Sequence, residues 1–337
     1  APKGNFGSIE NKGLEITLDA HPFTGDFQWD SNFQVSFNRN TLKALSGTTA
    51  ASIVGYGQWS DVVCVSEIGK PLYNFYGYIV EGVYESLEDI ENSPKTAKHP
   101  ENGVYNRSNT VWVGDLKYKD INQDGVINDQ DRTDIGSPLP LFTFGWNNTF
   151  RYKGFDLNIF LNGSYGNKVL NYSLMNGPSG GLASMRSAWV NQNNHAIKDR
   201  AQLAPIDPDK VYESGNWYDD ITNVKVVNSG TKTPRPTLND PNDNDRLSTR
   251  YIEDGSYLRI KNITLGYTFP KKWMQKAHFD NIRVYCNIQN LYTFTKYSGY
   301  DPEVGASTQD SSGYAYGVDN GRYPSPTTYS FGVSLSF

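Results

Sequence analysis

The C-terminal stretch of the chain alternates large apolar residues with small or polar ones. A β-strand with this period of two presents one apolar face and one polar face. In water the apolar face needs a protein core to cover it, whereas in a bilayer lipid covers it and the polar face lines a wet lumen. The apolar set is Tyr329, Phe331, Val333, Leu335 and Phe337, and Ser330, Gly332, Ser334 and Ser336 lie between its members.

The same alternation recurs six times upstream, so the sequence predicts seven strands. Short links join the first strand to the second and, through Tyr152, Lys153 and Gly154, the third to the fourth; a moderate link joins the fifth to the sixth. In the fifth strand the apolar parity changes between Ile260 and Ile263, which predicts a bulge near Lys261 and Asn262. The predicted strands cover residues 14–19, 27–37, 142–150, 155–162, 257–269, 282–294 and 327–337.

Every second connection is long. Residues 38–140, 166–255 and 296–326 are rich in Gly, Asn, Asp, Ser and Pro and are predicted to be external loops. Long loops at one end of a sheet and short turns at the other are typical of outer-membrane β-barrels, in which the short turns are periplasmic. A soluble β-sandwich also has alternating strands, but its loops are mostly short at both ends. We therefore predict an all-β fold, a transmembrane antiparallel β-barrel with extracellular loops and a periplasmic C-terminus.

Composition supports this class and excludes others. No apolar run approaches the roughly 18 residues that a membrane-spanning helix needs. The 337 residues carry a formal net charge of -5 with scattered basic residues, so nucleic-acid binding has no basis. Cys64 and Cys286 lie far apart, and we expect no disulfide between them. Seven strands cannot close a barrel in lipid, and bacterial barrels usually have an even count, so we expect the chain to be the later part of a longer polypeptide.

One local motif indicates a metal site. Residues 120–131 match the calcium loop D-x-[DN]-x-[DN]-G through its first six positions, because Asp120, Asn122 and Asp124 offer oxygens at positions 1, 3 and 5 and Gly125 permits the turn. The Val126 carbonyl would add a ligand at position 7. Asp131 stands at position 12 in place of the usual Glu, so its reach is shorter and lower affinity is expected. We predict a structural Ca²⁺ ion; the alternative is a metal-free turn rich in Asp and Asn.

Candidates for catalysis are weak, and we predict that the chain is not an enzyme. The four histidines, His21, His99, His195 and His278, are dispersed and have no carboxylate or cysteine at metal spacing. Gly177-Pro178-Ser179-Gly180-Gly181 has the spacing G-x-S-x-G, but we interpret it as a flexible loop and not as a nucleophile elbow. The carboxylate pairs Asp219-Asp220 and Asp243-Asp245 lie in polar stretches, where a solvated surface is the default. Aromatic runs at residues 73–78 and 314–316 could stack on sugar rings or pack a lid.

Several ordered motifs together resemble the C-terminal half of the SusC/RagA-type TonB-dependent transporters, and the resemblance spans nearly the whole chain. The calcium-like loop and the closing strand belong to it. The other segments are GDLKYKD at 114–120, DRTDIGSP at 131–138, YKGFD at 152–156, IEDGSYLRIKNITLGY at 252–267, QNLYT at 289–293, YSGYDPE at 297–303, IENKG at 9–13, GKP at 69–71 and FYGY at 75–78.

The resemblance implies a 22-stranded barrel in the outer membrane of a Gram-negative bacterium, of which residues 1–337 would form the last seven strands. It also implies an N-terminal plug, a contact with TonB through a missing N-terminal region, and a SusD-like surface lipoprotein that contacts the loops. The implied task is import of oligosaccharides or, in some members, peptides. The alternative from another class is a secreted, calcium-containing, carbohydrate-binding β-sandwich protein. Detergent dependence would separate the two.

Overall fold

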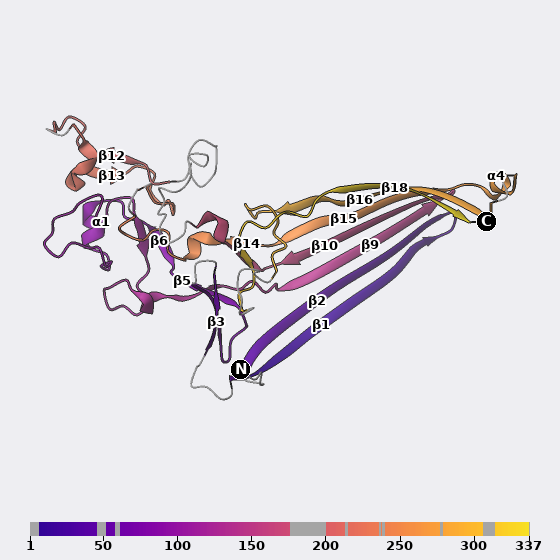
Figure 1. The fold of residues 1–337 in the computed structure, drawn as a ribbon, viewed down its shortest axis with the longest axis horizontal. Helices are drawn as coiled ribbons and strands as arrows, with labels where there is room; N and C mark the ends of the chain where they lie inside the picture. Colours follow the sequence, from indigo (N-terminus) through magenta and orange to yellow (C-terminus); the bar gives the residue numbers. More distant parts are fainter. Residues whose placement is uncertain are drawn as a thin grey trace, which may run out of the picture.

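Seven long strands form one antiparallel sheet in a computed structural model that describes residues 7–45, 52–57, 61–175, 200–212, 215–235, 237, 240–276, 279–305 and 314–336. The spatial order of the strands is their order along the chain, and Figure 1 shows them as a long curved sheet. The prediction of seven antiparallel strands is confirmed. The strands are β1 (Gly7–Thr24), β2 (Phe27–Leu45), β9 (Phe142–Tyr152), β10 (Phe155–Tyr165), β15 (Tyr257–Thr268), β16 (Asn281–Thr295) and β18 (Thr328–Ser336).

One face of this sheet is apolar, because directly paired residues of antiparallel strands point to the same side. A single row of paired positions crosses six strands, through Trp29, Phe150, Leu157, Leu265, Cys286 and Phe331. The side chains of Phe331, Val333 and Leu335 are 81%, 64% and 50% exposed. No second layer of the described chain covers this face, in contrast to the β-sandwich alternative.

The opposite face is polar along its length. Another paired row runs through Asp30, Thr149, Asn158, Thr264, Asn287 and Ser330. Its side chains bond across strands: the Asn287 amide donates to Asn262 Oδ1 and to Thr264 Oγ1, and the Asn158 amide donates to Thr149 Oγ1. Nearer the short turns, Arg283 of β16 makes a 2.5 Å ion pair with Asp156 of β10. These polar groups thus bond one another across the strands, a pattern that suits a face lining a wet lumen.

The predicted bulge is present. In the pairing of β15 with β10, Ile260 and Asn262 lie opposite the consecutive residues Leu161 and Phe160; the register with β16 also shifts at this point, where Asn290 and Leu291 of β16 lie between the paired positions. Lys261 is therefore the extra residue relative to β10, and it keeps Ile260 and Ile263 on the same face of the sheet. The turn between β9 and β10 is tighter than the predicted Tyr152–Gly154 link: only Lys153 and Gly154 connect the strands, both with positive φ, which suits the twist of a hairpin.

The first loop begins later than predicted. We expected it to start at residue 38, but β2 continues to Leu45 and pairs with β1 as far back as Gly7. The residues after Phe37 lose the apolar alternation, yet their main-chain groups still form the ladder, which does not require apolar side chains. The other strand ends, Tyr165 and Thr295, fall directly before the second and third predicted loops.

The loops gather at one end of the sheet, opposite the short turns and the C-terminus (Figure 1). They hold small sheets and short helices. One sheet contains β3 (Ser52–Tyr56), β4 (Val62–Glu67), β5 (Asn74–Gly77) and β8 (Thr133–Gly136); another contains β14 (Ile252–Asp254), β11 (Lys168–Asn171) and β17 (Val318–Asp319). The remaining pairs are β6 (Val80–Val83) with β7 (Leu116–Tyr118) and β12 (Leu203–Pro205) with β13 (Val224–Val226).

The helices within the part of the chain that the structure describes are short. They are α1 (Leu87–Glu91), α4 (Lys271–Lys276) and the 3-10 helices η1 (Asp129–Asp131), η2 (Tyr172–Leu174), η4 (Trp217–Asp219), η5 (Ile221–Asn223) and η6 (Thr249–Tyr251). Within the described ranges, no helix has the length and apolar character to cross a membrane.

The buried core of the chain lies in the loops rather than on the sheet. The loops hold two clusters of buried apolar residues. One contains Trp112, which is fully buried, together with Tyr78 and Tyr118, and the other contains Phe75 and Leu170. The aromatic run at residues 73–78 thus packs loop cores in part, through Phe75 and Tyr78. Cys64 is buried and Cys286 half-buried, and no disulfide joins them. The loop end therefore has the packing of a folded domain, whereas the sheet leaves its apolar face uncovered.

Candidate functional site

The predicted calcium loop is closed by bonds from its own backbone. Both oxygens of Asp120 accept, from the N–H of Gln123 at 2.7 Å and from the N–H of Gly125 at 2.8 Å, and Asp124 accepts from the Val126 N–H at 2.9 Å. Gly125 has φ +82°, a conformation that costs other residues strain. The structure therefore places Asp120, Asn122 and Asp124 around one turn, with the Asn122 amide 2.8 Å from an Asp124 oxygen.

Asp131 joins the two ends of this loop. It is fully buried, and its two oxygens accept from the N–H groups of Ile121 at 2.9 Å and Asn128 at 2.8 Å. Asn128 and Asp131 form a capping box on η1. Each carboxylate oxygen has two lone pairs, so these bonds leave acceptor capacity. Asp131 is thus already oriented whether or not it also binds a cation.

The donor set of the loop fits a hard cation, because it consists of carboxylate, amide and carbonyl oxygens. The Val126 carbonyl receives only a 3.5 Å contact from the Asn128 amide. Across the described residues, no group of three or more His, Cys, Asp or Glu side chains is placed to hold a metal ion. Two of the five predicted ligands are an amide and a main-chain carbonyl, which lie outside that ligand set. The calcium site therefore stays a prediction.

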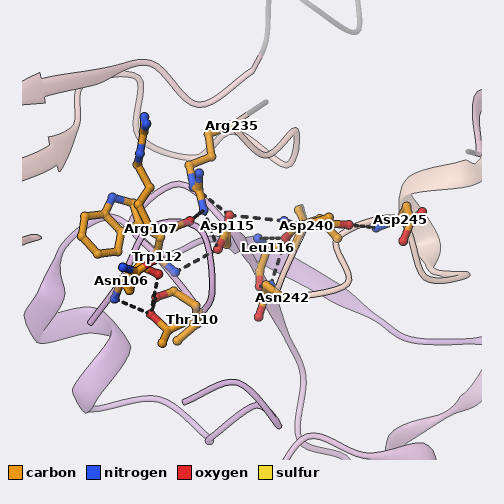
Figure 2. Close-up of polar contacts among 12 residues, drawn as sticks. Asn106, Arg107, Thr110, Trp112, Asp115, Leu116, Arg235, Asp240, Asn242 and Asp245 are labelled. Atoms are coloured by element: carbon orange, nitrogen blue, oxygen red, sulfur yellow. Dashed lines mark hydrogen bonds and ion pairs between the residues drawn. The ribbon is translucent and has the colours of Figure 1, made fainter. Parts of the chain in front are cut away.

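Figure 2 shows a buried ion pair in the loop region and the polar contacts around it. Asp115, just before β7, is fully buried, and its Oδ1 lies 2.9 Å from Nε of Arg235. This nitrogen approaches without hydrogen-bond alignment, but an Arg235 terminal nitrogen donates to Oδ2 at 3.2 Å and the Trp112 N–H donates to the same oxygen at 2.9 Å. Asp115 thus connects the first long loop to the second.

The run of Asp and Asn at residues 240–245 completes this network. Asn244 donates to Asp115 Oδ1 at 3.2 Å and to Asp240 Oδ1 at 2.6 Å, and its own oxygen accepts from the Leu116 N–H at 2.7 Å. Asn242 donates to the Leu116 carbonyl at 2.9 Å. The side chains thus satisfy the edge of β7, and the arrangement stabilises the loops rather than forming a reactive centre.

Burial and like charges shift two pKa values here. Burial raises the pKa of Asp115 to about 6, against the opposing effect of Arg235. Burial also raises the pKa of Asp245 to about 7, and the negative charges of Asp240 and Asp243 add to this effect. Both shifts are upward from the unfolded value near 3.8, so ionising these carboxyls costs folding free energy.

We predict that Asp245→Asn stabilises the protein at high pH. Because the pKa of Asp245 is raised on folding, the stability that its neutral carboxyl contributes is fully present below about pH 4 and is lost as the pH rises through about 7. The variant should therefore be more stable at pH 8, by on the order of 1 kcal/mol because water screens a partly exposed carboxylate, and equal to wild type at pH 4. Thermal unfolding in detergent, followed by tryptophan fluorescence, measures this. Asp209→Asn, on the exposed surface, is the control, and a gain that is independent of pH would contradict the prediction.

A second buried arginine joins the sheet to the third long loop. Arg259 of β15 is 2% exposed and donates to Asp301 at 2.5 Å, to Glu303 at 2.7 Å and to Thr293 at 2.9 Å. It belongs to the polar face, because it pairs with Thr293 of β16. This contact was not predicted from the sequence. A charged residue within a strand of mainly apolar parity is the signal that could have found it.

The contact with Arg259 fixes one wall of a cavity of about 620 Å³ at the loop end of the polar face. The cavity is lined by strand residues, which include Thr143, Ser164 and Tyr257, and by loop residues between 301 and 325. Its size is in the range of small-molecule sites.

The other candidate groups from the sequence are not brought together. His21 bonds Asp30 at 2.7 Å, and His99 contacts Tyr105 at 3.2 Å. His195 and His278 lie outside the described residues. Asp219 pairs with Arg107 and Asp220 with Lys210. Tyr316, from the second aromatic run, packs against Tyr73, with 5.7 Å between the two ring centroids. These contacts give no acid and base pair facing a common cavity.

Comparisons with known proteins agree with this architecture. The chain is 31% identical over 342 residues to TonB-dependent receptor P3 of Formosa agariphila and 26% identical over 335 residues to TonB-dependent receptor SusC of Bacteroides thetaiotaomicron. The match covers 99% of this chain but only 29% and 27% of those receptors. No family model matches the chain.

Solved structures show the same fold. The structure of the RagAB peptide transporter matches with a TM-score of 0.63 and 21% identity, over 98% of this chain and 29% of that one. The RagAB peptide importer in its open-open state matches with a TM-score of 0.61.

The strand order and the polar and apolar faces define this chain as an antiparallel sheet of the kind found in transmembrane β-barrels. The predicted resemblance is confirmed: the chain is homologous over nearly its whole length to TonB-dependent receptors of the SusC/RagA type, which are outer-membrane proteins. It spans less than a third of the length of the curated relatives that it matches. These relatives are receptors by name and the solved structures are transporters; the prediction that this chain is not an enzyme stays a prediction.

Proposed function

We propose that this chain forms part of the barrel wall of an outer-membrane TonB-dependent transporter that imports oligosaccharides or peptides. The observation that carries this proposal is the uncovered apolar face, whose rows of Phe, Leu, Ile and Val suit lipid while the paired row from Asp30 to Ser330 suits water. The wet face guides the solute. The loops at the other end from the turns are extracellular, and the C-terminus is periplasmic.

The two edges of the sheet support further strands. β1 and β18 are the edge strands, and each presents unpaired main-chain groups on its outer side. In hydrocarbon each unsatisfied group costs several kcal/mol, so the sheet must be closed. We propose that other strands of the same transporter complete the barrel, that a plug fills it, and that TonB energises it. A SusD-like surface lipoprotein would contact the folded loops.

Uptake by the native bacterium tests this function. Deleting the gene should abolish accumulation of a subset of fluorescently labelled oligosaccharides or short peptides, and a protonophore should abolish it in the wild type. Restoring the gene is the control. Unchanged accumulation of every tested oligosaccharide and peptide after deletion would contradict the proposal.

We also propose that Ca²⁺ binds at residues 120–131 as a structural ion. Support comes from the clustered oxygens of Asp120, Asn122 and Asp124 and from the fixed position of Asp131. Ile127 is buried in the apolar cluster around Trp112, and its N–H donates to the Lys95 carbonyl at 2.9 Å. The calcium-like loop is therefore attached to that cluster. A bound ion would hold this attachment in place.

Removing calcium is expected to lower stability. At 100 times its dissociation constant a bound ion adds about 2.7 kcal/mol, so EGTA should lower the unfolding temperature and added Ca²⁺ should restore it. Asp120→Asn should remove this response, whereas Asp209→Asn should keep it. In a crystal, oxygens of Asp120, Asn122 and Asp124 should lie about 2.3 to 2.6 Å from the ion. Distances of about 2.8 Å from these oxygens to the bound species, typical of a water molecule, would contradict the proposal.

A further inference from the structure

The cavity at the loop end of the sheet has a floor on the wet face. Ser164 of β10 pairs with Thr143 of β9 on one side and with Tyr257 of β15 on the other, so the three side chains share one row. All three line the cavity. They lie on the same parity as the polar row through Thr149, Asn158 and Thr264, because the bulge at Lys261 restores the register. A solute in the lumen would therefore reach this cavity.

The wall opposite the floor is held rigidly. Asp301 accepts from Arg259 and from the Glu303 N–H with one oxygen, and from the Ser325 N–H at 3.2 Å with the other. Glu303 accepts from Arg259 at 2.7 Å. Both carboxylates are thus committed to the protein, and the loop segments 301–305 and 322–325 are fixed to β15. These hydrogen bonds and ion pairs therefore fix the shape of this side of the cavity.

The cationic groups of the cavity are less engaged. The ammonium of Lys261 lies 4.0 Å from the nearest Glu303 oxygen, beyond hydrogen-bond distance. Among the described residues, the guanidinium of Arg322 has no hydrogen-bond or ion-pair partner. The two carboxylates of the lining, Asp301 and Glu303, are instead paired with Arg259, which lies behind it. The cationic donors of the lining, on Lys261 and Arg322, are therefore available to a ligand.

Aromatic rings complete the lining. Tyr323 is 87% exposed, so its ring offers a face at the rim. Tyr257 lies on the floor, with the Arg259 guanidinium 5.3 Å from its ring centroid. Exposed aromatic faces suit flat ligand surfaces, and spare cationic donors suit carboxylate or other anionic groups.

We propose that this cavity binds the anionic group of the transported solute, with Lys261 and Arg322 contacting the charge and Tyr323 contacting an adjacent ring or chain. The inference rests on the proposed function and adds a substrate class to it: anionic solutes. The carboxylate could come from an acidic oligosaccharide or from the C-terminus of a short peptide. Lys261 sits at the bulge, so the same irregularity that changes the parity of β15 also supplies a binding group.

Binding to the native protein, extracted from the outer membrane in detergent with its partners, tests the proposal. Calorimetry would use four probes: tetragalacturonate, neutral galactotetraose, tetra-alanine acetylated at its N-terminus and the C-terminal amide of that acetylated peptide. At least one anionic probe should bind wild type more tightly than its uncharged counterpart. Lys261→Gln with Arg322→Gln should weaken that binding roughly 10-fold or more, as expected for lost charged hydrogen bonds, and should leave neutral probes unchanged.

Matched variants separate binding from folding. Lys232→Gln removes an exposed cation outside the cavity and should bind like wild type. Tyr323→Phe should keep binding, whereas Tyr323→Ala should weaken it. Unchanged heat-modifiable mobility on electrophoresis would show that each variant folds. Preference for tetragalacturonate over galactotetraose assigns an acidic sugar, and preference for tetra-alanine over its amide assigns a peptide carboxylate.

Two results would overturn the proposal: equal binding of an anionic probe by wild type and by the double variant, or no binding of either anionic probe to wild type. Neither result would refute the transporter function, which the gene-deletion uptake experiment tests separately. Loss of that uptake together with either result would leave the transporter with another binding site.

Discussion

Phe331→Arg is expected to prevent most of the protein from reaching its folded state in the outer membrane. Phe331 is 81% exposed on the apolar face and ends the row that begins at Trp29. An arginine facing lipid near the middle of the bilayer costs about 2 to 4 kcal/mol. The loss appears as reduced outer-membrane abundance and as a lower free energy of unfolding in lipid vesicles.

Ser330→Arg is the matched control, because Ser330 is adjacent in sequence but lies on the polar face, opposite Asn287. Its arginine would reach water, so its cost should be much smaller. Equal losses from the two arginines would show that both faces of β18 meet the same environment, and the lipid assignment would fail.

Arg235→Met is expected to have the second large effect. It should lower the free energy of unfolding by about 3 to 5 kcal/mol near neutral pH, which is the range for leaving a buried charge without its partner. The partner here is Asp115, which is fully buried and also holds Trp112 and Asn244. Chemical denaturation in detergent, read through the fluorescence of the buried Trp112, measures the loss.

The pH dependence of this loss has a definite sign. Burial raises the pKa of Asp115 to about 6 even with Arg235 present, so wild-type stability contributed by the neutral carboxyl falls as the pH rises through that value. Without Arg235 the pKa should rise further, and protonation should relieve the unpaired charge. The cost of Arg235→Met should therefore shrink below about pH 5. Arg107→Met, which removes an exposed arginine paired with Asp219, should cost at most about 1 kcal/mol. A loss for Arg235→Met no larger than this would contradict the account.

The strands were predictable because their signal is local. Alternation from Tyr329 to Leu335 fixes which side chains share a face, and the parity change before Ile263 marks the bulge at Lys261. The end of β2 was not predictable in this way. Residues 38–45 pair with β1 through main-chain bonds, and main-chain pairing leaves no trace in side-chain parity.

The candidate sites divide by the same rule. The calcium loop is contiguous, so the spacing of Asp120, Asn122 and Asp124 identifies it directly. Asp115 and Arg235 are 120 positions apart, and Arg259 and Asp301 are 42 apart. Such pairs depend on how loops from different hairpins meet, which no local pattern specifies. The cavity above Tyr257 follows from the second of these pairs and was therefore missed as well.

The environment of β18 tests the central claim most directly. Single cysteines at positions 329 to 335, spin-labelled in lipid vesicles with Cys286 replaced by alanine, would report accessibility to dissolved oxygen and to a water-soluble nickel complex. Labels at 329, 331, 333 and 335 should favour oxygen, and labels at 330, 332 and 334 should favour nickel, alternating along the strand. Similar accessibility at all seven positions, or protection of the odd positions from both reagents, would contradict a sheet that separates lipid from water.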